Sequence, residues 1–384
     1  MKFSFHDGRL RALAYQAAAL GTTLALAWFL VGNTLENLAE RNIASGFAFL
    51  GREAGFAIGE TTFLSYSAAD TYLRALAVGL ANTARVAVIG ILAATALGTL
   101  IGLARLSRNW LVARVAAGYV EFVRNVPLLV QLFFLYAVMT EYLPAPRAAF
   151  QPLPGLYLSN RGIFLPVPEA HPVYGWMLIA CLAGLIAALL LRRWAATHRV
   201  PGRRLPLLEI GLSLALVPPA LAYLLAGAPT ALDVPKLAGF NFTGGMTISP
   251  EFATLAGGLI LYTAAFIAEI VRAGVQSVPS GQSEAAYALG LSSSRTLRHV
   301  VLPQALQAIV PPLTNQYLNL TKNSSLAVAI GYPDLVSIAN TTINQTGQAI
   351  EGIAIIMIVY LTISLSISAL MNWYNARVAL RGRG

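Results

Sequence analysis

The sequence has few residues that could support covalent or metal chemistry. Its 384 residues include one cysteine, Cys181, and four histidines that stand far apart rather than at metal-ligand spacing. It also lacks a phosphate-binding Gly-x-x-x-x-Gly-Lys-Ser/Thr segment, a His-Glu-x-x-His motif and a Gly-x-Ser-x-Gly elbow. Disulfide bonds within the chain are therefore excluded, and we expect no metal, no cofactor and no catalytic centre on this chain.

Charged residues are scarce as well. They make up 11% of the chain, whereas hydrophobic residues make up 57% and the mean hydropathy is +0.66. Such a composition leaves too little polar surface to cover a water-soluble globule. The net charge of +10 comes mainly from arginine, and no basic stripe alternates with aromatic residues, so nucleic acid is not an expected partner. We interpret the chain as an integral membrane protein whose apolar surface contacts lipid.

Apolar runs predict an all-α membrane protein. A helix needs about 20 apolar residues to cross the hydrocarbon core, and on that basis the sequence contains about eight spans. The first follows the basic residues Lys2, Arg9 and Arg11; it is too long for a signal peptide and no small-x-small cleavage site closes it. The predicted spans are residues 15–31, 76–103, 119–142, 173–191, 206–226, 252–275, 308–330 and 350–373.

Arginines gather in alternate connections between these spans, which predicts an orientation with both termini in the cytoplasm. The opposite connections are poorer in arginine or carry acids, as between residues 36 and 74. The arginines assigned to the cytoplasmic side are Arg105, Arg108, Arg114, Arg192, Arg193, Arg199, Arg203, Arg204, Arg295, Arg298, Arg377, Arg381 and Arg383.

Small residues recur every four positions in the second span, at Ala94, Gly98 and Gly102. Such a ridge lets another helix approach closely within a membrane. Glycine without a packing role is the alternative, because membrane helices tolerate it.

The most specific pattern lies between residues 281 and 303. It contains Glu284-Ala285-Ala286, then Gly290 and, after nine intervening residues, Val300-Val301-Leu302-Pro303. We expect two short helices at an elbow, with Glu284 in the first turn, Gly290 in a left-handed conformation and residues 292–294 capping the second helix. Ala285, Ala286 and Ala288 would form a small face, and Tyr287, Leu289 and Leu291 would anchor a partner. The pattern indicates docking; an ordinary amphipathic hairpin is the alternative.

This elbow resembles the ATPase-coupling loop of permeases in binding-protein-dependent importers, and the match includes Glu284, Ala285, Ala286, Gly290, Leu302 and Pro303. Other segments are similar to the polar amino acid uptake group: residues 82–83, 121–131, 268–274, 322–326 and 331–335. The resemblance covers residues 76–143 and 245–375. The chain departs from the usual Arg-Gly-Thr-Pro at 124–127 and from the usual Lys-Asp-Thr-Ser at 322–325.

The resemblance implies a type I ATP-binding-cassette importer permease (MetI-like) core with two extra inserted helices, as in general or acidic and amide L-amino acid systems. The implied divisions are an N-terminal span and periplasmic segment (1–75), two core parts (76–143 and 245–384) and an insertion (144–244). The implied partners are an ATPase dimer that binds ATP and Mg²⁺, a second related permease and a periplasmic amino acid binding protein. The implied location is a bacterial inner membrane.

Several polar residues within spans are candidates for a substrate pathway, because ionisable groups in a membrane usually face a cavity or a partner charge. Glu269 could meet an amino acid's ammonium group, or it could pair with Arg272 at the end of its span. Lys322 could neutralise a carboxylate, or it could extend to the interface. The further candidates are Arg124, Asn323, Ser324 and Ser325.

Two other functional classes remain open at this point. A stand-alone, ion-coupled secondary transporter would show inverted repeats with broken helices in matching positions, and the sequence shows neither clearly. A membrane scaffold without transport activity would not need the elbow and would tolerate replacement of Glu284 or Gly290.

Overall fold

The computed structural model describes residues 8–40, 46–197 and 206–381 of the chain. The predictions made for Lys2, Arg199, Arg203, Arg204 and Arg383 concern residues outside these ranges. The chain divides into two compact units, one made of Met1–Phe134 with Thr254–Gly384 and the other of Leu135–Ala253. The boundaries assigned from the sequence lie at 143/144 and 244/245 instead.

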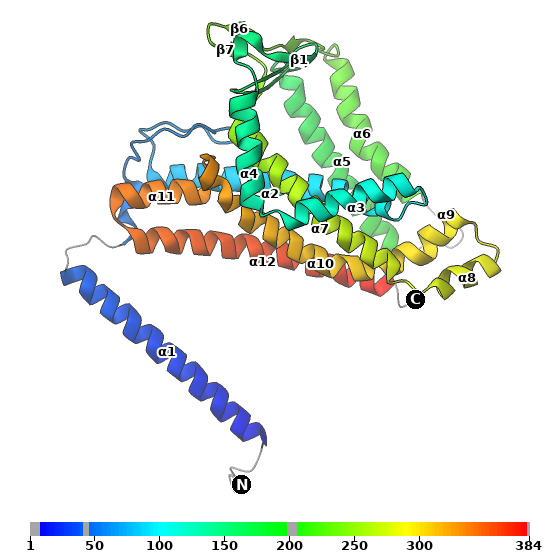
Figure 1. Cartoon of the computed structure of the whole chain (residues 1–384), viewed down its shortest axis with the longest axis horizontal. Helices are drawn as coiled ribbons and strands as arrows, with labels where there is room; N and C mark the ends of the chain where they lie inside the picture. Colours follow the sequence, from blue (N-terminus) through cyan, green and yellow to red (C-terminus); the bar gives the residue numbers. More distant parts are fainter. Residues whose placement is uncertain (1–7, 41–45, 198–205, 382–384) are drawn as a thin grey trace. The chain divides into compact units, whose positions relative to one another are not determined.

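Long helices dominate the first unit (Figure 1). They confirm the helical membrane fold predicted from composition. Their bounds are α1 Gly8–Glu40, α2 Tyr72–Arg105, α3 Trp110–Asn125, α4 Leu128–Ala137 (which continues into the second unit), α7 Pro250–Gln276 (which begins there), α8 Ser280–Ala288, α9 Ser293–Thr296, α10 Leu302–Asn323, α11 Leu335–Thr346 and α12 Ala349–Arg381. Two 3₁₀ segments, η1 Phe47–Gly51 and η5 Ser324–Ile330, and one π-helical turn, η4 Leu297–Val301, complete this unit.

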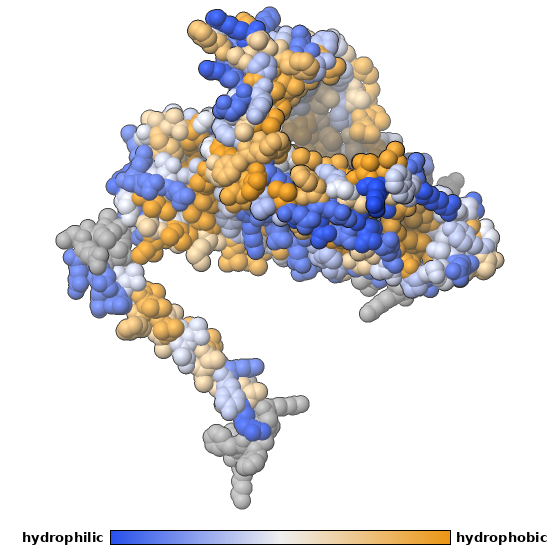
Figure 2. Space-filling model, in the orientation of Figure 1, coloured by the Kyte–Doolittle hydropathy of each residue, from blue (hydrophilic) through white to orange (hydrophobic). Residues whose placement is uncertain are grey.

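Among the described residues, five helices are long and apolar enough to cross a membrane, and there are up to seven spans if each of two bent helix pairs counts as one. The bent pairs are α3 with the α4 segment, and the segment from α9 to η5 with α11. The remaining predicted span corresponds to α6 (Leu207–Leu225), whose apolar part is shorter. Figure 2 shows hydrophobic residues over much of the visible surface of the helices, as lipid-facing surfaces require.

The small-residue ridge on α2 packs directly against α7. A Cβ atom on Gly98 would lie 2.7 Å from the Ile267 Cβ and 2.8 Å from the Ala264 carbonyl oxygen. One turn later, a Cβ atom on Gly102 would lie 2.8 Å from the Ala268 carbonyl oxygen. Ala94 in the same row is fully buried. The ridge therefore has the close-packing role that its four-residue spacing predicts, because only glycine lets the two backbones come this near.

The predicted span 119–142 is not one straight helix. Helices α3 and α4 meet at Val126 and Pro127 with a bend of 102°. Val126 is extended, as a residue before proline prefers, and Pro127 has no N–H to continue the helical hydrogen bonds. The Gln131 side-chain amide donates to the carbonyl oxygens of Val123 and Val126, both at 2.9 Å. These carbonyl groups are satisfied within the chain.

A second break separates η5 from α11. Gly331 ends η5 with a φ of +77°, and the helical directions before and after the break differ by 53°. Asp334 caps α11: its Oδ1 atom accepts a hydrogen bond from the Ser337 N–H at 2.8 Å. The span predicted at 308–330 ends at this break, and α11 was not predicted as a separate helix.

Residues 52–71, called here the 52–71 segment, lie against α2 and α11 and include neither a helix nor a strand. Backbone hydrogen bonds join Ala54 to Asp70 and Gly55 to Ala68 near its ends. A hydrophobic cluster beneath it consists of Phe49, Ala54, Tyr72, Ala75, Leu76, Leu335, Ile338 and Ala339. The cluster fixes the start of α2 against α11.

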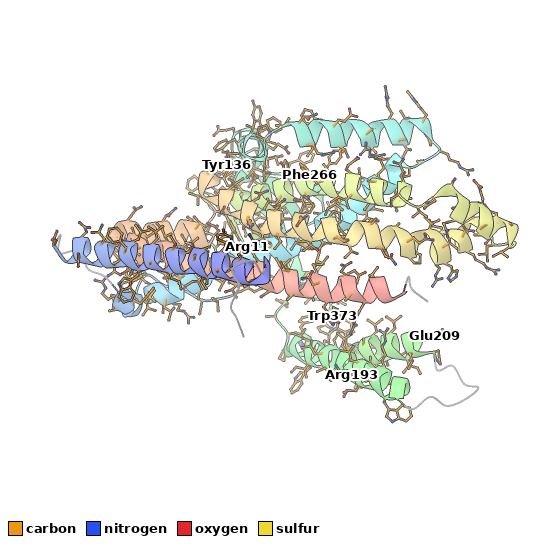
Figure 3. The ribbon with its side chains drawn as sticks, turned by 90° about the horizontal axis from the view of Figure 1, so that it is seen from below. Arg11, Tyr136, Arg193, Glu209, Phe266 and Trp373 are labelled. Carbon is orange, nitrogen blue, oxygen red and sulfur yellow. The ribbon has the colours of Figure 1, made fainter. Side chains whose placement is uncertain are left out.

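The second unit contains the two inserted helices that the sequence predicted, paired as a hairpin, and short strands that the sequence did not predict. Helices α5 (Pro172–Thr197) and α6 lie side by side, with Arg193 and Glu209 on their neighbouring ends (Figures 1 and 3). A Cβ atom on Gly184 would come within 1.8 Å of the Leu214 carbonyl oxygen, so this glycine permits the close contact between the two helices.

The strands pair across the base of this hairpin. A four-stranded antiparallel sheet has the order β1-β2-β3-β8, and β4–β5 and β6–β7 form two-stranded sheets. Strands β8 and β5, which follow α6, pair with β3 and β4, which precede α5. The bounds are β1 Phe150–Leu153, β2 Leu156–Ser159, β3 Gly162–Leu165, β4 Val167–Pro168, β5 Leu232–Asp233, β6 Lys236–Ala238, β7 Asn241–Thr243 and β8 Met246–Ile248, with short helical turns η2 Val138–Tyr142 and η3 Pro146–Ala148 before them.

Candidate functional site

The 281–303 elbow is built around a helix end that requires glycine. Helix α8 ends at Ala288, and Gly290 follows with a φ of +77°. The Gly290 N–H donates to the Tyr287 carbonyl at 2.9 Å and the Leu291 N–H donates to the Ala286 carbonyl at 3.1 Å. These two bonds define a Schellman motif, in which the residue in the Gly290 position is left-handed. The left-handed conformation predicted for Gly290 is confirmed.

Two details of the predicted elbow are wrong. Glu284 does not lie in the first turn, because α8 begins at Ser280, immediately after Pro279, which places Glu284 in the second turn. The three alanines do not share one face, because Ala286 is only 3% exposed and packs inward while Ala285 and Ala288 are exposed. Helical geometry explains the difference, since adjacent residues are about 100° apart around the axis.

The outward side of the elbow carries large hydrophobic residues. Tyr287 is 51% exposed, Leu289 is 83% exposed and Leu297 is 53% exposed. Leu291, predicted as a third anchor, is half-buried at the turn. Exposed Glu284, Arg295 and Arg298 lie along the same elbow. Large apolar residues within a charged rim are typical of a protein-docking surface.

The second arm of the elbow leads into α10. Ser292 occupies the position before α9, and its backbone carbonyl accepts from the Thr296 N–H at 2.8 Å, but its hydroxyl makes no capping hydrogen bond. A π-helical turn, η4, then precedes Leu302 and Pro303. Proline in this position lacks the N–H that an α-helical turn would use, which favours a local change in hydrogen bonding. Leu302 is 44% exposed and Pro303 is half-buried.

Glu269 lies between two arginines at the ends of α2 and α7. Its carboxylate pairs with Arg105 from α2, and it accepts a hydrogen bond from the Arg272 Nε atom at 3.2 Å. Arg272 also donates to Gln276 one turn later. Two guanidinium groups therefore neutralise this carboxylate already, and the arrangement corresponds to the ion-pair alternative for Glu269 and Arg272.

Lys322 lies apart from this cluster. It is exposed at the end of α10. Helices α7 and α10 meet where Gly274 packs on Ile309. From this contact, Glu269 lies five residues (about 8 Å) along α7, and Lys322 lies thirteen residues (about 20 Å) along α10. The Arg124 guanidinium lies 5.0 Å from the ring centre of Phe266, a residue labelled in Figure 3, one helical turn before Glu269 on α7. Lys322 and Glu269 therefore do not converge on one site.

The hydroxyl groups near Lys322 bond to their own helix. The Ser324 hydroxyl donates to the Thr321 carbonyl and the Ser325 hydroxyl donates to the Lys322 carbonyl, both at 2.7 Å. Ser324 is fully buried, whereas Asn323 and Ser325 are partly exposed. Both serines lie at the junction where α10 ends and η5 begins.

One largely buried ion pair was not predicted from the sequence. Arg85 on α2 pairs with Glu60 of the 52–71 segment, with Nη1 and Oε2 3.1 Å apart and side-chain exposures of 9% and 14%. Arg85 falls inside the predicted span 76–103, and a charged residue there is itself the signal that could have identified it. Its partner could not be identified in the same way, because Glu60 lies in a segment without periodicity.

Comparison with known proteins places these features in one family. The model of the family described as "Binding-protein-dependent transport system inner membrane component" matches residues 87–380, which include the α2 ridge and the whole elbow. The general L-amino acid transport system permease protein AapQ of Rhizobium johnstonii is 46% identical over 98% of this chain and 94% of its own length.

Two further relatives align over nearly the whole chain. The putative amino-acid ABC transporter permease protein YhdX of Escherichia coli is 48% identical over 98% of this chain and 96% of its own length. The glutamate/glutamine/aspartate/asparagine transport system permease protein BztB of Rhodobacter capsulatus is 41% identical over 98% of this chain and 96% of its own length.

The family match favours a permease over the ion-coupled transporter and the scaffold that the sequence left open. It agrees with the family that the elbow residues indicated. This chain belongs to the family of inner membrane components of binding-protein-dependent transport systems, and it is a permease subunit of such a system.

Proposed function

We propose that this permease moves polar L-amino acids across a bacterial inner membrane as part of an ATP-driven importer. The names of its relatives support this substrate class, since they transport general L-amino acids or glutamate, glutamine, aspartate and asparagine. ATP with Mg²⁺ is bound and hydrolysed by a separate ATPase dimer, and this chain performs no covalent step. A periplasmic binding protein delivers the solute, and a second, related permease completes the membrane pathway.

The elbow is the surface through which the ATPase drives transport. The observation that carries this proposal is the exposure of Tyr287 and Leu289 beside a rigid Schellman turn. Leu289 at 83% exposure can enter an apolar groove, and Arg295, Arg298 and His299 on the second arm favour acidic residues at the groove's rim. The elbow and both termini lie in the cytoplasm, in agreement with the arginine distribution.

ATP acts by selecting between two packed arrangements of the helices. Closure of the ATPase dimer moves the elbow, and α10, which continues from it, transmits the movement to the bundle. Packed helices favour discrete arrangements over continuous deformation, so binding energy at the elbow can favour one pathway orientation. The Arg105–Glu269–Arg272 cluster fastens α2 to α7 near the elbow.

The test is the change Leu289→Asp in the transporter reconstituted with its ATPase, second permease and binding protein. Because Leu289 is 83% exposed, the change should leave folding intact while placing a charge in the docking groove. We expect ATPase co-purification and ATP-dependent uptake of radiolabelled glutamate and glutamine to fall at least about tenfold, equivalent to about 1.4 kcal/mol of docking energy.

A matched control is Leu237→Asp, because Leu237 is an exposed leucine on the β6 strand, outside the elbow. It should leave ATPase co-purification unchanged. Normal ATPase binding by the Leu289→Asp variant would contradict the docking role. ATP-independent, gradient-driven uptake by the isolated chain would contradict the importer itself.

The glycine of the turn gives a second test. A Cβ atom on Gly290 would meet no other atom within 4 Å, so substitution acts only through the φ of +77°. Gly290→Val should therefore disrupt the elbow and uptake, whereas Gly290→Asn should retain most activity because asparagine tolerates this conformation. Equal loss in both variants would show that backbone conformation is not the reason for glycine here.

A further inference from the structure

The 52–71 segment is fastened to α2 by a largely buried ion pair and by a hydrogen bond to the exposed Thr62. Arg85 donates to the Glu60 carboxylate at 3.1 Å and to the Thr62 hydroxyl at 2.9 Å. The Arg85 and Glu60 side chains are 9% and 14% exposed. A charge pair this far from solvent holds its partners in a defined geometry, because loss of either charge leaves the other unpaired.

The same contact extends to the break between η5 and α11. The Asn82 side-chain amide donates to the Glu60 carbonyl at 3.0 Å and to the Pro333 carbonyl at 2.9 Å. The Tyr332 hydroxyl donates to the Asn82 carbonyl at 3.4 Å. One buried asparagine therefore joins the 52–71 segment, α2 and the break.

Helix α11 lies between two glycines with a left-handed backbone. Gly331 before it and Gly347 after it have φ values of +77° and +73°. Neither would bring a Cβ atom within 4 Å of another atom, so their backbone conformation, rather than lack of space, calls for glycine. Element-terminal residues of this kind are positions at which hinge movements take place. The start of α11 is held on α2 at Gly79.

The position of Arg85 along α2 places this contact at one membrane boundary. Residues 86–104 carry no charge, and their length of about 28 Å matches a hydrocarbon core of about 30 Å. Arg105, at the other end of this stretch, belongs to the cluster near the elbow. The Glu60–Arg85 contact therefore lies at the boundary opposite the elbow, where the proposed function places the binding protein.

We propose that residues Glu60–Thr62 form a latch that, through Arg85 and Asn82, holds the 52–71 segment on α2 beside the η5–α11 break in the resting transporter and releases during each transport cycle. The latch rests on the proposed function, because the step that releases it is the arrival of the loaded binding protein on this side. It gives the permease a means of staying inactive until solute is delivered.

Cross-linking tests whether release is required. In a Cys181→Ser background, Glu60→Cys with Arg85→Cys replaces the ion pair by two thiols that a short, reducible bis-methanethiosulfonate can join, and mass spectrometry measures the fraction joined. We expect ATP-dependent glutamate uptake by the reconstituted transporter to be lost on cross-linking and restored by reductant. Full uptake by the cross-linked protein would overturn the latch, and failure to cross-link would contradict the contact.

Neutralising the latch tests whether it restrains the resting state. Glu60→Gln should raise ATP hydrolysis in the absence of binding protein about tenfold, which corresponds to about 1.4 kcal/mol of lost restraint. Glu53→Gln is the matched control, because Glu53 is exposed in the same segment and its backbone alone pairs with Thr71. It should leave basal hydrolysis unchanged.

The outcomes separate the latch from a purely structural contact. If Glu60→Gln lowers basal and stimulated hydrolysis in parallel, the pair only stabilises the fold and the latch is wrong. If wild-type uptake requires neither ATP nor binding protein, the proposed function fails instead. Wild-type uptake is therefore measured before the variants.

Discussion

Helices α7 and α12 are both long apolar helices of the same unit, but their surroundings are opposite. In the most apolar 18-residue stretch of α7, 61% of the residues are buried, whereas in that of α12 none is. Yet α12 is the more hydrophobic of the two, and α7 carries Glu269 and Arg272. Trp373 on α12 and Phe266 on α7 are both labelled in Figure 3.

The contrast follows from the lipid that surrounds these helices in place of water. In a membrane, lipid is as apolar as a protein core, so hydrophobicity does not select the residues that lie inside. Close packing and polar pairing select them instead. Helix α7 is internal because Gly98 and Gly102 on α2 admit it and because Arg105 pairs with its carboxylate. Helix α12 contacts α10 and α11 with one side and leaves leucine and isoleucine on the other.

The change expected to break this contrast most strongly is Gly98→Leu. Its Cβ atom alone would come within 2.8 Å of the Ala264 carbonyl, so α7 would have to move away from α2, at a cost of about 3 kcal/mol. Thermal unfolding in detergent, followed by size-exclusion chromatography, measures the loss. Gly257→Leu on α7 is the control, since a Cβ atom there meets nothing within 4 Å. Equal loss in both variants would refute the packing role.

An intermediate effect is expected from Glu269→Gln. The change leaves Arg105 and Arg272 facing each other without the carboxylate between them. Because these side chains are 14% to 28% exposed, solvent weakens the repulsion, and we expect a loss of about 1 to 2 kcal/mol in the same assay.

Adding Arg105→Gln to this variant should recover part of the stability, because it removes one of the two guanidinium charges that Glu269→Gln leaves without a carboxylate. The uptake KM separates the two interpretations of Glu269. An unchanged stability with a raised KM for glutamate would show that Glu269 meets the solute, contrary to the ion-pair interpretation.

The smallest effect is expected on α12 from Leu361→Ala. Leu361 is 59% exposed, and alanine contacts lipid as well as leucine does, so the free energy of unfolding should fall by less than about 0.5 kcal/mol. The isolated chain in detergent and the assembled transporter should behave alike. A loss of assembly confined to the complete transporter would show that another permease chain covers this face.

Some features of this architecture could be predicted because a single residue type, such as glycine, fixes the local backbone conformation or the closeness of helix packing. Gly290 was expected to be left-handed, and the Schellman bonds at Tyr287 and Ala286 require that conformation. The ridge at Ala94, Gly98 and Gly102 was visible as a four-residue period. The bend of 102° at Pro127, by contrast, interrupts a segment that was predicted as one span.

Other features could not be predicted because their partners lie far away in the sequence. A pair with Arg272, three residues away, was one of the two alternatives for the Glu269 carboxylate, but Arg105, which is 164 residues distant, was in neither. Glu284 was expected in the first turn of its helix. It lies in the second turn, because α8 begins at Ser280, directly after Pro279. The strands at residues 150–168 and 232–248 pair across a helical hairpin, and their short lengths gave no periodic signal.

The sequence alone determined that this is a membrane protein, which family its elbow indicates and that Gly290 is left-handed, because hydropathy and backbone restrictions act residue by residue. Only the tertiary structure decided which helices are internal and which charges are paired. It joined Arg85 to Glu60 and Arg105 to Glu269, because in a membrane the partners of a buried charge are selected by proximity in three dimensions.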